Sequence, residues 1–138
     1  MKLDDLTHKP GLLRGQRILV TGGGSGLGRV MTEAMVLLGA HVHICGRRAA
    51  VVEATAAQLN ATHGAHGGRV SALACDIRDT DAIHAMVDAI WQEGPLSGLV
   101  NNAAGNFISR PEDLSPRGFD AVANIVLRGS FNVTLECG

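Results

Sequence analysis

The sequence contains no tyrosine, and its only lysines, Lys2 and Lys9, lie near the N-terminus. A reaction that requires a tyrosine–lysine pair therefore cannot be completed by these residues alone. Three cysteines, Cys45, Cys75 and Cys137, are an odd number without metal-ligand spacing. This argues against a disulfide framework and favours buried free thiols at Cys45 and Cys75. A reducing, cytoplasmic environment fits this cysteine usage best.

Other absences narrow the function further. No apolar run is long enough to cross a membrane, and residues 1–10 contain acidic side chains instead of the apolar core of a signal peptide. The formal net charge of −1 gives no electrostatic reason to expect nucleic acid or an anionic membrane as a partner. The motifs of serine hydrolases and P-loop proteins are also missing. We therefore expect no nucleic-acid partner and no membrane partner.

The most informative stretch is a glycine-rich turn with the pattern Thr21-Gly22-x-x-x-Gly26-x-Gly28. It follows an Ile- and Val-rich run, residues 17–21, and precedes a helical pattern over residues 27–38. Glycine lets the backbone approach a ligand closely, and the start of a helix presents unpaired N–H groups that favour phosphate. The residues expected to bind a nucleotide cofactor here are Thr21, Gly22, Gly24, Ser25, Gly26, Leu27 and Gly28. The alternative is a glycine-rich surface loop without a ligand.

The rest of the chain alternates between short strands and longer helices. Strands are expected at residues 17–21, 41–45, 69–75 and 99–103, and helices at residues 27–38, 49–62, 80–91 and from Ser115 towards the C-terminus. This order predicts an α/β fold: a Rossmann-type doubly wound parallel sheet with strand order 3-2-1-4 and helices on both faces. We expect an N-terminal arm, residues 1–16, and one incomplete dinucleotide-binding domain, residues 17–138. A ligand crevice should open between strands 1 and 4.

Two further strand ends indicate which cofactor fits. Arg47 and Arg48 follow the second strand, where proteins that prefer NAD usually carry an acid that binds the ribose 2′-hydroxyl. Guanidinium groups bind phosphate well, so the expected cofactor is NADP(H), with its 2′-phosphate on these arginines. The alternative is that both arginines only begin a solvated helix. Asp76 and Ile77 follow the third strand and suit an adenine contact, although an Asp at a strand end often only caps the next helix.

Three motifs in this order resemble the short-chain dehydrogenase/reductase family: the glycine-rich turn, Asp76-Ile77, and Asn101-Asn102-Ala103-Ala104-Gly105. Together they cover the whole chain. Residues 101–109, with Leu114-Ser115-Pro116 and Ile125-Val126-Leu127-Arg128-Gly129, resemble more narrowly the 2,4-dienoyl-CoA reductases and related bacterial oxidoreductases. Those reductases are NADPH-dependent enzymes of unsaturated fatty acid β-oxidation. The resemblance implies an acyl-CoA substrate and a homo-oligomer of the full-length protein, formed through the last helix and a neighbouring element that these residues lack.

The resemblance also implies roles for the matched positions. The loop after the fourth strand would add Asn102, Ala103, Ala104 and Gly105 to the cofactor site. Arg78, Phe107 and Ser115 would contact the acyl-CoA, and Asn106 would donate a hydrogen bond to the thioester carbonyl. Hydride addition to a dienoyl thioester places negative charge on that oxygen, so a donor there stabilises the transition state more than the substrate. Asn106 is therefore the candidate catalytic residue; the alternative is an Asn that only satisfies a turn.

The sequence departs from the family pattern in two ways. Many members carry a catalytic Asn three residues before the glycine of the last helix, whereas Val126 stands there in this chain. This disfavours the proton relay of alcohol and ketone dehydrogenases and agrees with the dienoyl-CoA branch. The chain also stops at Gly138, whereas the family continues with a half that carries the catalytic Tyr and Lys. The 138 residues are thus expected to be the N-terminal half of such an enzyme and to be inactive alone.

Four histidines are weaker candidates for a site. His41 and His43 lie two residues apart and share one face of a strand, which is compatible with metal binding. No nearby carboxylate or cysteine set completes that site in the sequence, so no metal is expected. His63 and His66 lie in a glycine-rich loop and are expected to be solvated.

Two alternative functions remain open at this point. A ketone or alcohol oxidoreductase of the same fold would share the cofactor site and differ in its substrate. A non-catalytic dinucleotide-binding module would need neither tyrosine nor lysine, and for these 138 residues alone it is the better chemical description.

Overall fold

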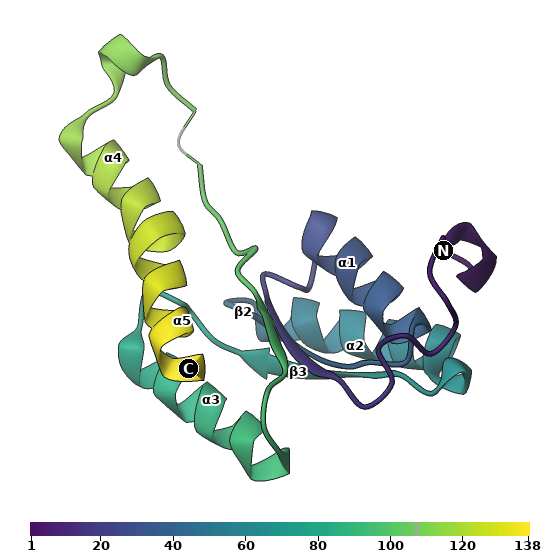
Figure 1. Cartoon of the computed structure of the whole chain (residues 1–138). Helices are drawn as coiled ribbons and strands as arrows, with labels where there is room; N and C mark the ends of the chain where they lie inside the picture. Colours follow the sequence, from purple (N-terminus) through teal and green to yellow (C-terminus); the bar gives the residue numbers. More distant parts are fainter. Residues whose placement is uncertain (107) are drawn as a thin grey trace.

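The structure, a computed structural model, describes residues 1–106 and 108–138 (Figure 1). The strands are β1 (Arg17–Thr21), β2 (His41–Gly46), β3 (Arg69–Ala74) and β4 (Gly98–Val100). The α-helices are α1 (Gly26–Leu37), α2 (Ala49–His63), α3 (Thr80–Glu93), α4 (Pro116–Ala123) and α5 (Ser130–Cys137). Short 3-10 turns occupy Leu3–Asp5, Gly64–His66 and Pro111–Asp113, and a π-helical segment, Asn124–Gly129, joins α4 to α5.

The strands run parallel in one sheet with the order β3-β2-β1-β4. β1 pairs with β2 over its whole length, from Arg17 opposite His41 to Thr21 opposite Cys45. Because neighbouring strands are parallel, each connection has to cross a face of the sheet, and helices make these crossings. The predicted α/β fold with strand order 3-2-1-4 is confirmed.

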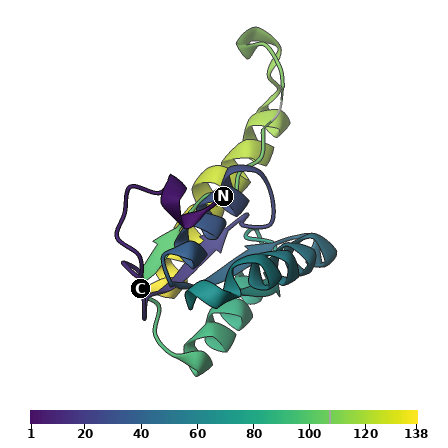
Figure 2. The same cartoon turned by 90° about the vertical axis from the view of Figure 1, so that its right-hand side faces the viewer.

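Helices cover both faces of the sheet (Figures 1 and 2). On one face α1 and α2 bury Val36 and Leu59 against alternate residues of β1, β2 and β3. On the other face α3 and α5 bury Ile90 and Val133 in a second core, which Leu19 of β1 joins. Burial of one such aliphatic side chain stabilises the folded state by about 2 kcal/mol. The two cores hold the carboxyl ends of the strands in fixed positions.

β4 is shorter than the strand predicted at residues 99–103, because it ends at Val100. The chain beyond it turns towards β1. There the Thr21 hydroxyl accepts hydrogen bonds from the backbone N–H groups of Asn102, at 3.0 Å, and Ala103, at 2.9 Å. These N–H groups are bound to a side chain and therefore do not continue the strand pairing.

The last helical region is not the continuous α-helix predicted from Ser115. The start is as predicted, since Ser115 is the N-cap of α4 and its Oγ accepts a hydrogen bond from the N–H of Gly118 at 3.1 Å. The backbone then widens into the π-helical segment before α5 begins. Gly129 of this segment packs so closely that a Cβ there would lie 2.8 Å from Cδ1 of Ile77. Segments of this kind are rare and often occur at functional sites.

Along α1 the buried residues are Gly28, Thr32, Val36 and Leu37, whereas Leu27 and Val30 are exposed. One sequence-based expectation about burial is wrong. His63, expected in solvent, is the buried last residue of α2, and its Nε2 lies 2.8 Å from Oε1 of Glu33 on α1. The side-by-side packing of α1 and α2, which local sequence does not reveal, creates this contact.

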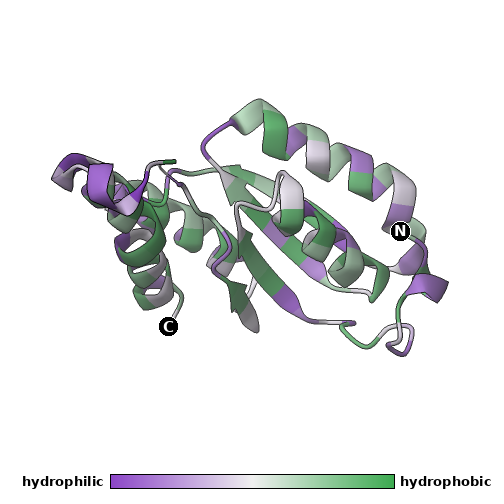
Figure 3. Ribbon diagram, turned by 90° about the horizontal axis from the view of Figure 1, so that it is seen from above, coloured by the Kyte–Doolittle hydropathy of each residue, from purple (hydrophilic) through white to green (hydrophobic). Residues whose placement is uncertain are grey.

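The C-terminal helices carry five exposed large apolar side chains, here called the apolar band: Phe119, Val126, Leu127, Phe131 and Leu135. Figure 3 colours much of the ribbon near the C-terminus green, for hydrophobic residues. No helix in the described part of the chain is both long and apolar enough to cross a membrane.

Candidate cofactor-binding site

A crevice of about 550 Å³ opens at the carboxyl ends of the strands. It lies between the turn after β1 and the loop after β4, where the strand order reverses and where ligands bind in sheets of this kind. The start of α2 and the loop after β3 complete its walls. The lining residues are Gly22, Gly24, Ser25, Leu27, Gly28, Cys45, Gly46, Arg47, Arg48, Val51, Val52, Cys75, Asp76, Ile77, Asn102, Ala103, Ala104 and Ile125.

The glycine-rich turn has a shape that only glycine permits at two of its positions. Gly22 adopts a φ of +67°, which L side chains rarely adopt. At Gly28 a Cβ would lie 2.4 Å from the carbonyl oxygen of Gly22 and 2.5 Å from Nδ2 of Asn102. The missing side chain lets the first turn of α1 pack directly on the turn, so the N-terminus of α1 faces the crevice. This is the arrangement that suits a phosphate.

Hydrogen bonds from outside the turn hold its shape. The N–H of Gly22 donates to the carbonyl of Cys45 at 2.9 Å, and the hydroxyl of buried Thr55 donates to the carbonyl of Gly24 at 2.8 Å. The Nδ2 group of Asn102 donates to the carbonyl of Thr21 at 2.9 Å. The turn is therefore fixed by β2, α2 and the loop after β4, independently of any ligand.

Thr21 joins the two sides of the crevice although it does not itself line it. Its side chain is fully buried, and its oxygen accepts the two N–H groups that follow β4. Thr21 therefore positions the loop after β4, and its predicted contact with the cofactor stays a prediction.

Thr21→Val is expected to lower the free energy of unfolding by about 2 kcal/mol, because it leaves two backbone N–H groups without an acceptor. Thr21→Ser keeps the oxygen and should lose less than half as much. Urea unfolding followed by circular dichroism measures both variants. Equal losses for Val and Ser would show that the methyl group, and not the hydroxyl, supplies the stability.

Arg47 and Arg48 begin the wall formed by α2. Both side chains are exposed and both line the crevice. Neither takes part in an ion pair within the described part of the chain. Two guanidinium groups that no ion pair occupies among the described residues, at the edge of a nucleotide-sized crevice, can take a phosphate.

Asp76 and Arg78 form a bidentate pair at the mouth of the crevice. Nη2 of Arg78 lies 2.5 Å from Oδ2 of Asp76, and Nε lies 3.0 Å from Oδ1. The hydrogen bonds from Arg78 hold the pKa of the Asp76 carboxyl below its usual value. Asp76 does not cap α3, because Asp79 is the N-cap and accepts from the N–H groups of residues 81 and 82. Asp76 is thus an oriented carboxylate that faces the crevice.

The structure brings together most of the predicted cofactor residues but not the predicted substrate residues. Gly26 and Gly105 lie beside the lining without being part of it, and Arg78 pairs with Asp76. Asn106 is exposed and outside the lining, and the oxygen of Ser115 caps α4. Phe107, predicted to contact the acyl-CoA, lies outside the described residues.

Sequence reasoning missed six lining residues: Cys45, Gly46, Val51, Val52, Cys75 and Ile125. The first five adjoin predicted positions at strand ends or the start of α2, so the rule that ligands bind at carboxyl ends of strands could have found them. Burial raises the pKa of Cys45 to about 12 and that of Cys75 to about 11, so both thiols stay neutral and form an apolar floor. Ile125 comes from the π-helical segment, which no sequence pattern predicts.

Comparisons with known proteins agree with this geometry. Residues 16–137 match the family described as short chain dehydrogenase. A peroxisomal 2,4-dienoyl-CoA reductase of Arabidopsis thaliana is 39% identical over 130 residues, which cover 94% of this chain and 42% of the relative. A citronellol catabolism dehydrogenase from Pseudomonas aeruginosa is 42% identical with a TM-score of 0.86, covering 96% of this chain and 53% of that structure. An NADP active-site complex of RhlG from the same bacterium is 26% identical with a TM-score of 0.84, covering 95% of this chain and 50% of that structure.

The chain spans about half the length, or less, of the proteins that it matches. The family match nevertheless extends over almost the whole chain, and the parallel sheet with its glycine-rich turn is the fold that this match requires. The chain belongs to the short-chain dehydrogenase family of oxidoreductases.

Proposed function

We propose that this chain binds NADP(H) in the crevice, with the cofactor's 2′-phosphate on Arg47 and Arg48. The observation that carries the proposal is the pair of exposed guanidinium groups that line the crevice where an NAD-binding protein usually carries an acid. The pyrophosphate would lie against the N-terminus of α1, and Asp76 would accept from the adenine amino group. The NADP complex among the similar structures supports this choice of cofactor.

Arg47→Ala is expected to weaken NADPH binding about 10- to 100-fold, because a hydrogen-bonded charge pair with phosphate is lost. NADH binding should change by less than about twofold, since NADH has no 2′-phosphate. Isothermal titration calorimetry with both cofactors measures this difference. Arg117→Ala, which removes an exposed arginine outside the crevice lining, is the matched control. Equal weakening of NADPH and NADH by Arg47→Ala would contradict the assignment.

For the whole protein we propose reduction of a 2,4-dienoyl-CoA thioester. NADPH, when bound, supplies the hydride, and Asn106 would donate a hydrogen bond to the thioester oxygen as negative charge develops there. Arg78, Phe107 and Ser115 would contact the acyl-CoA once the second half of the protein completes the substrate pocket. The relative from Arabidopsis, named as a 2,4-dienoyl-CoA reductase, supports this substrate class.

The test is consumption of NADPH, followed by its absorbance, with a 2,4-dienoyl-CoA as substrate. A protein that joins these residues to a second half with Tyr and Lys should consume NADPH. The 138-residue chain alone should show no turnover, because it has no tyrosine and no lysine beyond Lys9. Activity of the complete protein on ketones or alcohols alone, without reduction of the dienoyl thioester, would overturn the proposed substrate class.

Two other functions have specific support. The similarity to a citronellol catabolism dehydrogenase favours an alcohol or ketone oxidoreductase as the second candidate, and the same substrate comparison distinguishes it. A non-catalytic dinucleotide-binding module is favoured only by the absence of tyrosine from the sequence. Cofactor binding without turnover by the complete protein would identify that third case.

We further propose that the complete protein is a homo-oligomer that buries the apolar band on the C-terminal helices. Phe131 and Leu135 on α5 are more than half exposed, at 60% and 64%, so they are available to pack against a second copy. Sedimentation analysis should show an oligomer for the complete protein. A monomer at micromolar concentration would contradict this assignment.

The proposed compartment is the cytoplasm, as the free cysteines suggest. The Arabidopsis relative is named as peroxisomal, so a peroxisomal location is the alternative. A fluorescent fusion of the complete protein, viewed in its own cells, distinguishes the two locations.

A further inference from the structure

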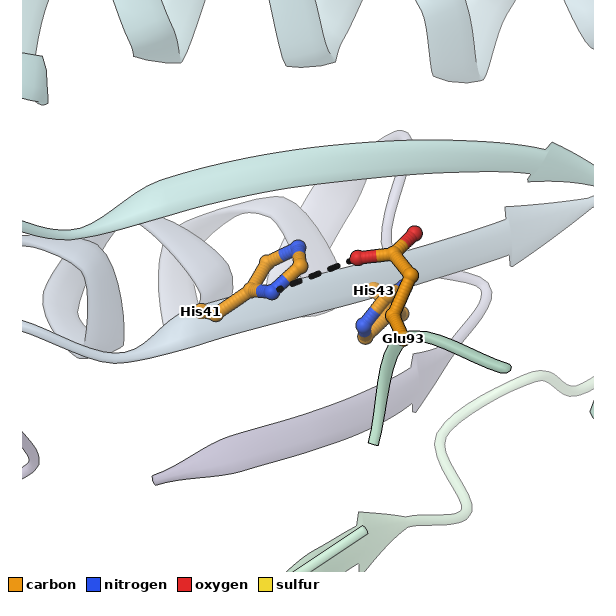
Figure 4. A group of neighbouring side chains, drawn as sticks. All are labelled: His41, His43 and Glu93. Carbon is orange, nitrogen blue, oxygen red and sulfur yellow. Dashed lines mark ion pairs between the residues drawn. The ribbon is translucent and has the colours of Figure 1, made fainter. Parts of the chain in front are cut away.

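A second cluster of polar side chains lies at the amino-terminal edge of the sheet, opposite the cofactor crevice. His41 and His43 stand side by side on β2, with ring centroids 4.1 Å apart. Glu93, the last residue of α3, reaches the same place (Figure 4). Arg17 and Arg69, which begin β1 and β3, flank the histidines. None of these residues lines the crevice.

The hydrogen bonds determine which ring nitrogens carry a lone pair. Nη1 of Arg17 and Nη2 of Arg69 both lie 3.1 Å from Nδ1 of His41. Because a guanidinium group can only donate, Nδ1 must be the acceptor, and the other nitrogen, Nε2, carries the proton and donates to Oγ of Ser71 at 2.8 Å. By the same reasoning Nε2 of His43 accepts from Nη1 of Arg17 at 3.2 Å.

Three acceptor atoms therefore converge on one point. Nη1 of Arg17 lies 3.1 Å from His41, 3.2 Å from His43 and 3.2 Å from Oε2 of Glu93. The three acceptors all lie within 4.8 Å of one another. Two guanidinium groups already donate to these acceptors: Arg17 to all three, and Arg69 to His41 and, at 3.5 Å, to Glu93.

The protonation states suit a metal as well as a guanidinium group. Burial lowers the pKa of both His41 and His43 to about 4, so both rings are neutral at pH 7 and each keeps one unprotonated nitrogen, which here accepts from guanidinium groups. The hydrogen bond from His41 to Ser71 fixes the orientation of that ring, as a second-shell partner does for a metal-bound histidine. Glu93 is 45% exposed, so the cluster has an opening to solvent through which an ion can enter.

We propose that His41, His43 and Glu93 form a binding site for a divalent transition metal such as Zn²⁺, in competition with the guanidinium groups of Arg17 and Arg69. Two imidazoles and one carboxylate are a ligand set that Zn²⁺ accepts, with water at the fourth position, whereas Mg²⁺ and Ca²⁺ prefer oxygen ligands. Zinc–nitrogen distances of about 2.1 Å require the ligands to close in as Arg17 leaves. Arg17 is also held by a 2.8 Å hydrogen bond to the carbonyl of Glu93, whereas Arg69 reaches the ligands through Nη2 alone. Both groups have to withdraw for the metal to bind, and the displacement of Arg17 is the more costly of the two.

The test is calorimetric titration of the chelator-treated chain with Zn²⁺ at pH 7.5, together with the visible spectrum of the Co²⁺ complex. The wild-type chain should bind one Zn²⁺ and give the intense absorption of tetrahedral Co²⁺. Arg17→Met, which removes the competitor that contacts all three ligands and keeps the apolar part of the side chain, should tighten binding about tenfold or more. Glu93→Gln should weaken binding, and His43→Gln should abolish it.

His84→Gln is the matched control. His84 is an exposed histidine with two carboxylate neighbours, Asp88 at 3.3 Å and Glu136 at 2.5 Å, and it is the obvious place for adventitious zinc. The His84→Gln variant should bind Zn²⁺ with the affinity of the wild type. Loss of binding in His84→Gln, or an affinity in Arg17→Met no higher than that of the wild type, would overturn the proposal. The second of these outcomes does not depend on whether His43→Gln folds.

Discussion

Gly28→Ala is expected to weaken NADPH binding about 100-fold and to lower the free energy of unfolding by about 3 kcal/mol. The added Cβ would lie 2.4 Å from the carbonyl oxygen of Gly22 and 2.5 Å from Nδ2 of Asn102. Neither atom can move without breaking the hydrogen bonds that join the two sides of the crevice. Calorimetry with NADPH and urea unfolding measure the two effects separately.

Gly64→Ala is the matched control for this substitution. Gly64 has a right-handed backbone conformation, and a Cβ there would meet no atom within 4 Å. This variant should keep the cofactor affinity and the stability of the wild type, within about 0.5 kcal/mol. If Gly28→Ala behaved like Gly64→Ala, the close packing of α1 on the glycine-rich turn would not be what shapes the phosphate site.

The second large effect is a loss of stability between pH 6.5 and pH 4. Burial holds the pKa of His41 and His43 at about 4 in the folded chain, whereas the unfolded chain binds these protons near pH 6.5. Below pH 6.5 the unfolded state therefore carries more protons, and the free energy of unfolding falls as the pH falls. Each histidine can contribute up to about 3 kcal/mol to this loss. Urea unfolding at successive pH values, with a chelator present, measures it.

Charged groups around these histidines shift their pKa values further. The guanidinium groups of Arg17 and Arg69 lower the two pKa values, and Glu93 raises them. His43→Gln should remove about half of the loss between pH 6.5 and pH 4, whereas His84→Gln should not. The pKa of His84 is raised by its bond to Glu136, so the stability it contributes is present below pH 6.5 and disappears as the pH rises through that raised value. An unfolding free energy that stays constant from pH 6.5 to pH 4 would contradict the lowered pKa values of His41 and His43 in the folded chain.

The order of strands and helices could be predicted from the sequence because each element carries a local signal. The glycines that follow residues 17–21 mark the end of a strand, and Gly39 marks the end of α1 with a φ of +95°. Once the order was known, the handedness of parallel crossovers left few sheet topologies, and the strand order followed. The early end of β4 could not be predicted, because it depends on the hydroxyl of Thr21, a residue far away in the sequence.

In the two sites as well, features with a local sequence signal could be predicted, and features that depend on distant contacts could not. Arg47 and Asp76 follow strands directly, so the rule for carboxyl ends of parallel strands places them at the crevice. Ile125 reaches the crevice through a π-helical turn, which has no clear sequence signature. Glu93 meets His41 and His43 only because α3 packs across the sheet, and for this reason the expectation that no carboxylate completes the histidine pair was wrong.

The most direct test of the central claim compares two nucleotides that differ in a single group. Adenosine 2′,5′-bisphosphate carries the 2′-phosphate of NADP(H), and adenosine 5′-monophosphate lacks it. Calorimetric titration of the wild-type chain should show that the bisphosphate binds at least about tenfold more tightly and is displaced by NADPH. Equal affinity for the two nucleotides, or tighter binding of the monophosphate, would contradict the assignment of Arg47 and Arg48 to the 2′-phosphate.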